Sequence, residues 1–293
     1  MQDRGVTVPI ISVILGIAAF SAMDVAMKSA AIAAGVFSAV VLRNLSGAAL
    51  ALPLWLAWRR RALRGKVLRL HLIRAAVVAA MAPLFFFGIV RIPLAEAIAI
   101  SFIAPLIALY LASLLLGERI RPGAILASLL GLVGVAIIAA GRIGRGAWNE
   151  DAALGTASIL CSAVFYALNL VIQRRQAQVA GPLEIAFFQN LLVGLIILPA
   201  APWLFAWPDP AALRTILLGA VLATVALLLL SWGYARAEAQ VLLPIEYTGF
   251  LWAALFGWLA FDEKVAPGTL AGAVLIVAGC MIAGRRHTEQ TSA

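Results

Sequence analysis

Three ionisable side chains interrupt the first two apolar stretches of the chain. Asp24 and Lys28 lie in the segment FSAMDVAMK, and Arg43 lies in the next apolar stretch. If these stretches cross a bilayer, each charge costs about 2.5–3.5 kcal/mol near the centre. Such residues are retained where they pair with one another, fix helix packing or bind a charged solute.

The composition of the chain requires a membrane. Its 293 residues are 64% hydrophobic and 12% charged, with a mean hydropathy of +1.05, whereas soluble domains have roughly 45–50% apolar and about 25% charged residues. The net charge of +9 lies mostly in short spacers between apolar runs. That placement is typical of an oriented membrane protein and argues against nucleic-acid binding.

The sequence predicts an all-α integral membrane protein with ten transmembrane helices, because apolar runs of roughly 20 residues can span a bilayer. With the N-terminus inside, 15 lysines and arginines fall on the cytoplasmic side and 5 outside. The positive-inside rule then places both termini in the cytoplasm. The predicted spans lie near 8–31, 36–58, 75–91, 94–116, 123–141, 153–173, 183–205, 213–234, 239–261 and 267–284.

The chain repeats itself at an offset near 145 residues, which divides it into units 1–146 and 147–293. FSAMDVAMK aligns with FYALNLVIQ, RNLSGAALALP with QNLLVGLIILP, and GERIRPG with DEKVAPG. Because each unit has five spans, an odd number, the two units are predicted to enter the membrane from opposite faces. Inverted repeats of this kind are typical of secondary transporters that work by alternating access, with the substrate near the midplane.

The two five-helix units, with the acid-ended fourth span SFIAPLIALYLASLLLGE and a glycine-spaced fifth span, resemble the drug/metabolite transporter superfamily of the EamA type. The stretch LLPIEYTGFLWAALFGWLAFDE resembles the amino-acid exporters of that superfamily, particularly the YddG-type aromatic amino-acid exporters. The resemblance implies ten helices around a central cavity. It also implies export of amino acids or related small metabolites across a bacterial inner membrane.

Two interpretations of the buried charges stay open. Asp24 and Arg43 are nearly equidistant from the turn at 33–35, so an antiparallel hairpin holds them at about the same depth, and Lys28 is one turn after Asp24. The cluster either fixes helix packing while Lys28 snorkels outward, or lines the outer half of the pathway. There Arg43 or Lys28 would meet a substrate carboxylate and Asp24 an ammonium; a gate would combine both roles. Neutral polar candidates nearby or at aligned positions are Asn44, Asn169, Gln189 and Asn190.

Glu246, in the ninth predicted span, has no basic residue within one helical turn. Burial would disfavour its charged form, which makes it a candidate for proton coupling or for binding a substrate ammonium. Alternatively, it faces a cytoplasmic vestibule and stays solvated. Ser101, close to Pro105, marks a point where backbone carbonyls could be freed near the midplane. The candidate aromatic walls of the cavity, which could equally be ordinary packing residues, are Phe165, Tyr166, Tyr247 and Trp252.

The leading hypothesis is therefore an exporter of small, largely apolar metabolites, with amino acids favoured by the resemblance. A drug or nucleotide-sugar carrier of the same fold is the main rival, although nucleotide sugars should need more buried cations than Lys28 and Arg43. A membrane enzyme would need a clustered His, Cys or Asp constellation, and a channel would not need the inversion. We expect a small-molecule substrate and the lipid bilayer as partners, and no cofactor, metal or obligate protein partner.

Overall fold

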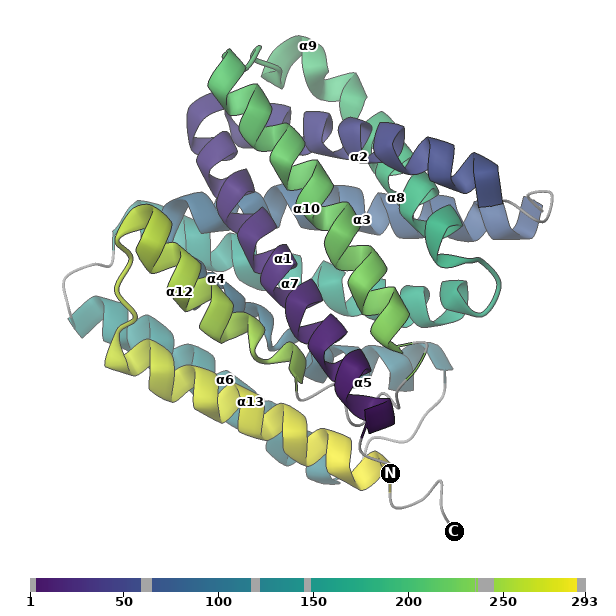
Figure 1. The fold of residues 1–293 in the computed structure, drawn as a ribbon. Helices are drawn as coiled ribbons and strands as arrows, with labels where there is room; N and C mark the ends of the chain where they lie inside the picture. The colour runs from purple at the N-terminus through teal and green to yellow at the C-terminus, as the bar shows by residue number, and fades with distance from the viewer. Residues whose placement is uncertain are drawn as a thin grey trace.

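The chain folds into a bundle of packed helices (Figure 1). The computed structural model describes residues 4–58, 65–116, 122–144, 149–234, 236 and 245–288, and no strand occurs among them. The elements are α1 (Arg4–Ala34), α2 (Val36–Trp58), α3 (Gly65–Arg91), α4 (Leu94–Ser101), α5 (Ala104–Leu116), α6 (Pro122–Gly144), α7 (Glu150–Ala177), α8 (Pro182–Ile197), the 3₁₀ turn η1 (Leu198–Ala200), α9 (Ala201–Leu204), α10 (Pro210–Tyr234), α12 (Gly249–Phe261) and α13 (Pro267–Thr288).

The outer surface of the bundle is suited to contact with lipid. Among the described residues, six helical stretches are long and apolar enough to cross a membrane, and four further apolar stretches are shorter. Large apolar side chains such as Leu132, Leu218 and Leu251 are more than half exposed. Surfaces of this kind are unfavourable in water and favourable against acyl chains. The chain is therefore a multi-pass membrane protein, while the count of ten spans stays a prediction.

The first hairpin turns at a single glycine. Ala34 ends α1, Val36 begins α2, and Gly35 between them has φ of +79°. A side chain there would meet the left-handed backbone penalty of about 1–2 kcal/mol, which glycine avoids. The turn lies where the sequence predicted it. It directs the start of α2 back along the last third of α1.

Two predicted spans are not continuous helices. The run expected over 94–116 splits into α4 and α5, because Pro105 has no N–H to donate to the Ser101 carbonyl and its ring crowds that carbonyl. The run expected over 183–205 splits into α8, η1 and α9 in the same way, at Pro199. The third helix, in contrast, is longer than predicted and begins at Gly65 instead of near 75.

The helices α6 and α13 lie side by side along one edge of the bundle (Figure 1). Gly134 faces Gly272 so closely that a Cβ on Gly272 would lie 2.5 Å from the Gly134 carbonyl oxygen. Further along, Gly268 faces Gly141. Numbers rise on one helix as they fall on the other, so the two helices run antiparallel. They are the fifth predicted span of each repeat unit.

The second predicted spans of the two units, α2 and α8, also pack antiparallel. Gly47 lies against the Asn190 side chain, and Gly194 lies against Leu45. At the same interface the Trp55 and Phe187 rings stack with their centroids 4.9 Å apart. The contact continues over more than two turns of each helix, so it is a substantial interface between the two halves of the chain.

The fourth predicted spans repeat the arrangement. Leu94, at the start of α4, lies against Gly257 in α12. At the other end of α4, the Phe102 and Tyr247 rings meet edge to face with centroids 5.2 Å apart. Phe102 and Tyr247 are aligned positions of the repeat, and both lie in short turns that interrupt the helical path. Three pairs of aligned spans therefore pack antiparallel.

The remaining long helices pair across the two halves. The first span of the N-terminal half, α1, packs along α10, and the first of the other half, α7, packs along α3. In each pair, a serine of the first span donates to a backbone carbonyl of its neighbour. Ser12 Oγ donates to the Leu229 oxygen (2.8 Å), and Ser162 Oγ donates to the Met81 oxygen (2.9 Å). These side-chain bonds tie the pairs together without exposing a polar group to lipid.

The close approach of α6 and α13 gives a stability prediction. Gly272→Ala places a methyl group against rigid backbone, so we expect a loss of about 1–3 kcal/mol, typical of overpacking. Gly268→Ala is the matched control, because its Cβ would lie 3.5 Å from Gly141 Cα, an ordinary contact. Thermal unfolding in detergent should lower the Tm of the first variant by several degrees and leave the second near the parent. Equal Tm values for the two variants would contradict this packing.

Candidate functional site

An arginine and two asparagines meet where α2 packs against α8. Arg43 Nη1 donates to Asn44 Oδ1 (3.3 Å) and to Asn190 Oδ1 (3.2 Å). Each asparagine donates its Nδ2 to the carbonyl four residues earlier, Asn44 to Val40 (2.8 Å) and Asn190 to Ala186 (3.0 Å). The local bonds orient both carboxamides, so that both Oδ1 atoms accept from the guanidinium. The two asparagines are aligned positions of the repeat.

Asp24, from α1, is the acidic neighbour of this group. Its side chain is buried, and its charge attracts that of Arg43. The Gly35 hairpin thus brings the two residues together. Two residues, Arg43 and Gln189, hold polar atoms without a hydrogen-bond partner in the described part of the chain. These atoms are Arg43 Nε and both polar atoms of the Gln189 carboxamide, and all are buried. A buried polar group left unsatisfied costs about 1–3 kcal/mol.

Lys28 has a partner that the sequence did not suggest. Its Nζ forms an ion pair with Glu263 Oε1 and donates to the Ile92 carbonyl oxygen (3.0 Å). Glu263 Oε2 accepts from the Leu94 N–H (2.7 Å), and the Lys28 ammonium lies 5.0 Å from the centre of the Phe261 ring. The group joins the end of α1 to the α3–α4 corner and to the linker after α12. Lys28 is only 4% exposed, so it does not snorkel outward.

Arg74 in α3 is bonded by three amide side chains of α7. Its Nε donates to Asn169 Oδ1 (2.8 Å), Nη1 to Gln176 Oε1 (2.5 Å) and Nη2 to Gln173 Oε1 (2.9 Å). Arg74 lies just outside the predicted third span, 75–91, but α3 begins at Gly65 and therefore holds Arg74 inside the helix. The amides recur at four- and three-residue intervals, so they share one face of α7. That spacing was a signal available in the sequence.

His71 extends the same network by one turn. Its Nδ1 lies 2.7 Å from Gln176 Nε2, its Nε2 lies 3.1 Å from Glu184 Oε1, and its ring stacks on Phe188. His71 is fully buried, although it lies before the predicted third span, 75–91. The reason is again the early start of α3. The chain of hydrogen bonds runs from Glu184 through His71 and Gln176 to Arg74, and it ties α3, α7 and α8 together.

The two helix interruptions contribute aromatic rather than polar groups. Phe102 and Tyr247 face one another there, as described above. The Ser101 hydroxyl donates to the Ala97 carbonyl oxygen on its own helix (2.8 Å), which satisfies the hydroxyl locally. The hydroxyl of Thr248, next to Tyr247, bonds in the same manner to the Ile245 oxygen (2.7 Å).

Tyr166 connects the two polar regions. Its phenol interacts electrostatically with Arg74, with Glu246 and with Asp24, which come from three different helical segments. Glu246 itself is exposed, so the expectation of a buried carboxylate is wrong and the solvated alternative describes it better. Asn169, three residues after Tyr166 on α7, already bonds Arg74.

Two other aromatic candidates lie in apolar packing. Trp252 packs with Val13 and Ile17 of α1 and stacks on Phe256, with ring centroids 5.6 Å apart. Phe165 is half-buried on α7. Trp252 therefore fits the ordinary packing alternative, Tyr247 packs on Phe102, and Tyr166 lies near the charged groups.

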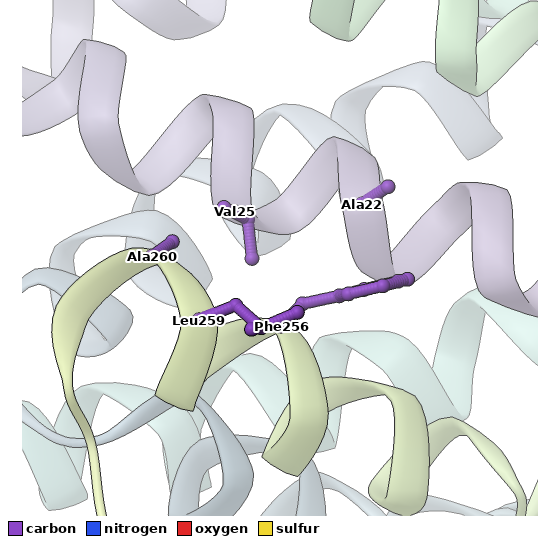
Figure 2. Close-up of a pocket in the computed structure, with 5 residues that line it drawn as sticks. All are labelled: Ala22, Val25, Phe256, Leu259 and Ala260. Carbon is purple, nitrogen blue, oxygen red and sulfur yellow. The ribbon is translucent and has the colours of Figure 1, made fainter.

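An open groove lies between α1 and α12 (Figure 2). It holds about 220 Å³ and is lined by Ala22, Val25, Phe256, Leu259 and Ala260. All five side chains are apolar, and Leu259 is 65% exposed. A groove of this chemistry suits an acyl chain and offers no side-chain partner to a charged solute.

The fold and the buried polar groups define a multi-pass membrane protein that holds charged side chains among its helices. Comparison with known proteins supplies its family. The profile of the EamA-like transporter family matches residues 7–140 and again residues 153–285, which is most of the chain. The chain belongs to the EamA-like transporter family, as the resemblance predicted.

Relatives of the chain are named as transporters of different molecules. The pseudopaline exporter CntI of Pseudomonas aeruginosa is 29% identical over 274 residues, covering 91% of this chain and 92% of that protein. A riboflavin transporter of Brucella anthropi is 25% identical, with coverages of 92% and 96%. A probable terminal-alkyne amino-acid exporter of Streptantibioticus cattleyicolor is 27% identical, with coverages of 97% and 94%. A solved crystal structure shares the fold with a TM-score of 0.64 at 20% identity, over 98% of this chain and all of that one.

The Arg74 network gives the second prediction. Arg74→Lys keeps the charge but cannot present three directed donors to Asn169, Gln173 and Gln176, so at least one buried amide oxygen loses its partner. We expect a loss of about 1–3 kcal/mol, measured as a lower Tm in detergent. Arg175→Lys, at an exposed position on α7, is the control and should leave the Tm unchanged. A Tm for Arg74→Lys equal to that of the parent would contradict the network.

Proposed function

We propose that the chain is a secondary transporter that exports amino acids, aromatic or otherwise largely apolar, and related small metabolites across the bacterial inner membrane by alternating access. The observation that carries the proposal is the antiparallel packing of aligned spans: α2 on α8, α6 on α13, and the fourth predicted span on the ninth, through α4 and α12. Two units related by an axis along the membrane normal would have aligned helices running parallel. Antiparallel aligned helices are what an axis in the membrane plane requires.

The other helix contacts support the same symmetry. Exchange of the two units converts the α1–α10 contact into the α7–α3 contact, and the α2–α10 contact into the α8–α3 contact, and all four are present. We therefore propose ten spans in two inverted units, 1–146 and 147–293, around a central cavity, with both termini in the cytoplasm. The six long apolar helices and four shorter ones fit this count, and the lysine and arginine bias favours this orientation.

The charge inventory of the interior favours a zwitterion. Arg43 and Arg74 bring two positive charges whose hydrogen-bond partners are neutral amide oxygens. Asp24 brings one negative charge inside the bundle, and Glu246 brings a second at an exposed position. Side chains of both signs suit a solute with one carboxylate and one ammonium. A nucleotide sugar would need an excess of cations, and Lys28 is already paired with Glu263.

The Lys28 ion pair supports a gate. In the proposed orientation, the end of α1, the α3–α4 corner and the α12–α13 linker all lie on the outer side. Lys28, Ile92, Leu94 and Glu263 connect these three segments through buried bonds. Their association holds the outer end closed, and their separation would open it. Lys28 is thus a pathway residue that acts by closing the route, not by binding the solute.

Counterflow tests the function. Purified protein in liposomes preloaded with an unlabelled amino acid should take up the labelled amino acid severalfold faster than in unloaded liposomes, because a carrier exchanges bound solute. Aromatic and aliphatic amino acids form the first panel, and riboflavin and nucleotide sugars form the second. A channel would show no stimulation by preloading. Stimulation confined to the second panel would contradict amino-acid transport and favour the rival carrier.

The gate is tested by access from outside. Lys28→Gln or Glu263→Gln should speed labelling of a cysteine at Ala97, a fully buried α4 position, by an impermeant maleimide. The expected factor is about tenfold or more, since breaking a buried ion pair costs about 3–5 kcal/mol and 1.4 kcal/mol is a factor of ten. The double variant should be no faster than the singles, because both remove one interaction.

The matched control for the gate is an exposed ion pair on the same side of the bundle. Arg91 and Asp151 lie 3.5 Å apart, and the Asp151 side chain is 74% exposed, so Asp151→Asn should leave labelling unchanged. The native cysteines are replaced by alanine in all variants. Equal labelling rates in the Lys28→Gln, Asp151→Asn and parent proteins would exclude a gate at Lys28.

A further inference from the structure

Two residues at aligned positions of the repeat, one on α2 and one on α8, hold buried polar atoms without a partner. Arg43 and Gln189 occupy equivalent positions of the repeat, and each immediately precedes one of the two asparagines that meet there. Arg43 Nε and the Gln189 carboxamide are buried without partners within the described residues. Unsatisfied buried groups are rare in folded proteins, and here they come from both halves of the chain, each next to an asparagine of the α2–α8 contact.

The neighbouring side chains are already committed, so they do not provide the missing bonds. Asn44 and Asn190 donate to the backbone of their own helices and accept from Arg43 Nη1. This arrangement holds the guanidinium in place and leaves its Nε–H edge for another acceptor. Gln189 buries one donor group and one acceptor without partners, which costs free energy. An apolar side chain of similar size would pack there without that cost. These groups therefore fit a ligand better than they fit packing alone.

The missing partners define the ligand. Arg43 Nε–H and Gln189 Nε2–H need acceptors, and Gln189 Oε1 needs a donor. The α-carboxylate of an amino acid supplies two acceptor oxygens, and its α-ammonium supplies a donor one carbon away. Asp24, whose charge attracts that of Arg43, offers the ammonium a second acceptor. A phosphate or sulfate carries no such donor, and a neutral sugar brings no charge to the guanidinium.

We propose that Arg43 and Gln189, on either side of the Asn44–Asn190 pair, form the subsite that binds the α-carboxylate and α-ammonium of the transported solute. The subsite rests on the proposed amino-acid transport and adds its recognition element. Both halves contribute one residue each, so closure of the halves around the solute completes the bonds. Selectivity for the side chain of the solute then lies elsewhere, and the partly buried aromatic residues Tyr166, Phe102 and Tyr247, which pack against the main core, are candidates for it.

The test compares solutes that differ only at the α-carbon groups. Labelled L-phenylalanine counterflow is competed with unlabelled L-phenylalanine, its amide, its methyl ester, phenethylamine and N-acetyl-L-phenylalanine. If the parent protein exchanges another amino acid instead, the same series is built on that one. For the parent, we expect the amide, the ester and the amine to compete about tenfold or more weakly than the free acid, as for a lost charged hydrogen bond.

The variants are Gln189→Met, which keeps length and removes both polar atoms, and Arg43→Lys, which keeps charge and removes the Nε–H. In each variant, the free acid and the amide should compete with labelled solute at strengths that differ by no more than about threefold, since the charged hydrogen bonds that distinguish them are lost. Gln178→Met, at an exposed position, is the control and should keep the parental ratio. Equilibrium binding of the same series to monodisperse detergent-purified protein supplies the ratio for a variant that binds but no longer exchanges.

The outcomes separate the subsite from the function. A parent that exchanges amino acids but does not distinguish acid from amide overturns the subsite and leaves transport intact. The same holds if Gln189→Met and Arg43→Lys keep the parental ratio. A parent that exchanges no amino acid overturns the proposed function itself. Loss of discrimination in both variants, with the control unchanged, supports the subsite.

Discussion

The whole arrangement depends on a constraint that lipid imposes: a charged or polar group within the bundle must find its partner in the protein. Water cannot supply it inside the hydrocarbon, and each unsatisfied group costs several kcal/mol there. Lys28 meets this constraint with Glu263 and the Ile92 carbonyl oxygen, and Arg74 meets it with three amides of α7. Because these bonds join segments that lie far apart in the sequence, the polar groups also determine which segments lie together.

The same constraint explains why polar groups and close packing occur together. Glycines allow α6 to approach α13 and α2 to approach α8, which brings backbone and short side chains within hydrogen-bonding distance. At the α2–α8 contact the close approach places Asn190 over Gly47 and within reach of Arg43. A larger residue at position 47 would push Asn190 away from the guanidinium. Packing and electrostatics are therefore parts of one design at this interface.

The sequence predicted features that depend on local pattern. Gly35 marked the first turn, the hairpin brought Asp24 beside Arg43, and the aligned asparagines 44 and 190 proved to bond in the same way. Apolar runs and repeats are enough for such features, because spacing along a helix fixes depth and face. The family followed from the same patterns.

Features that depend on the far side of the bundle could not be predicted. Glu263 lies between the predicted spans 239–261 and 267–284, and nothing in its neighbourhood indicates a lysine 235 positions away. Arg74 and His71 lie before the predicted span 75–91, because hydropathy does not tell how far a helix with a few charges continues. Glu246 has no basic residue nearby in the sequence, which suggested a buried carboxylate, but its side chain is exposed. Hydropathy shows where a helix crosses the membrane but not which neighbour its polar face meets.

The two halves differ most where they are charged. Three ionisable residues of the first unit align with neutral amides of the second: Asp24 with Asn169, Lys28 with Gln173, and Arg43 with Gln189. In an inverted repeat with identical units, the two closed arrangements would have equal free energy. An ion pair available to only one of them lowers the free energy of that arrangement and raises its population. In the transporter that we propose, the unequal halves would give the bundle a preferred resting state with the outer end closed, which suits export because the solute would first enter from the cytoplasm.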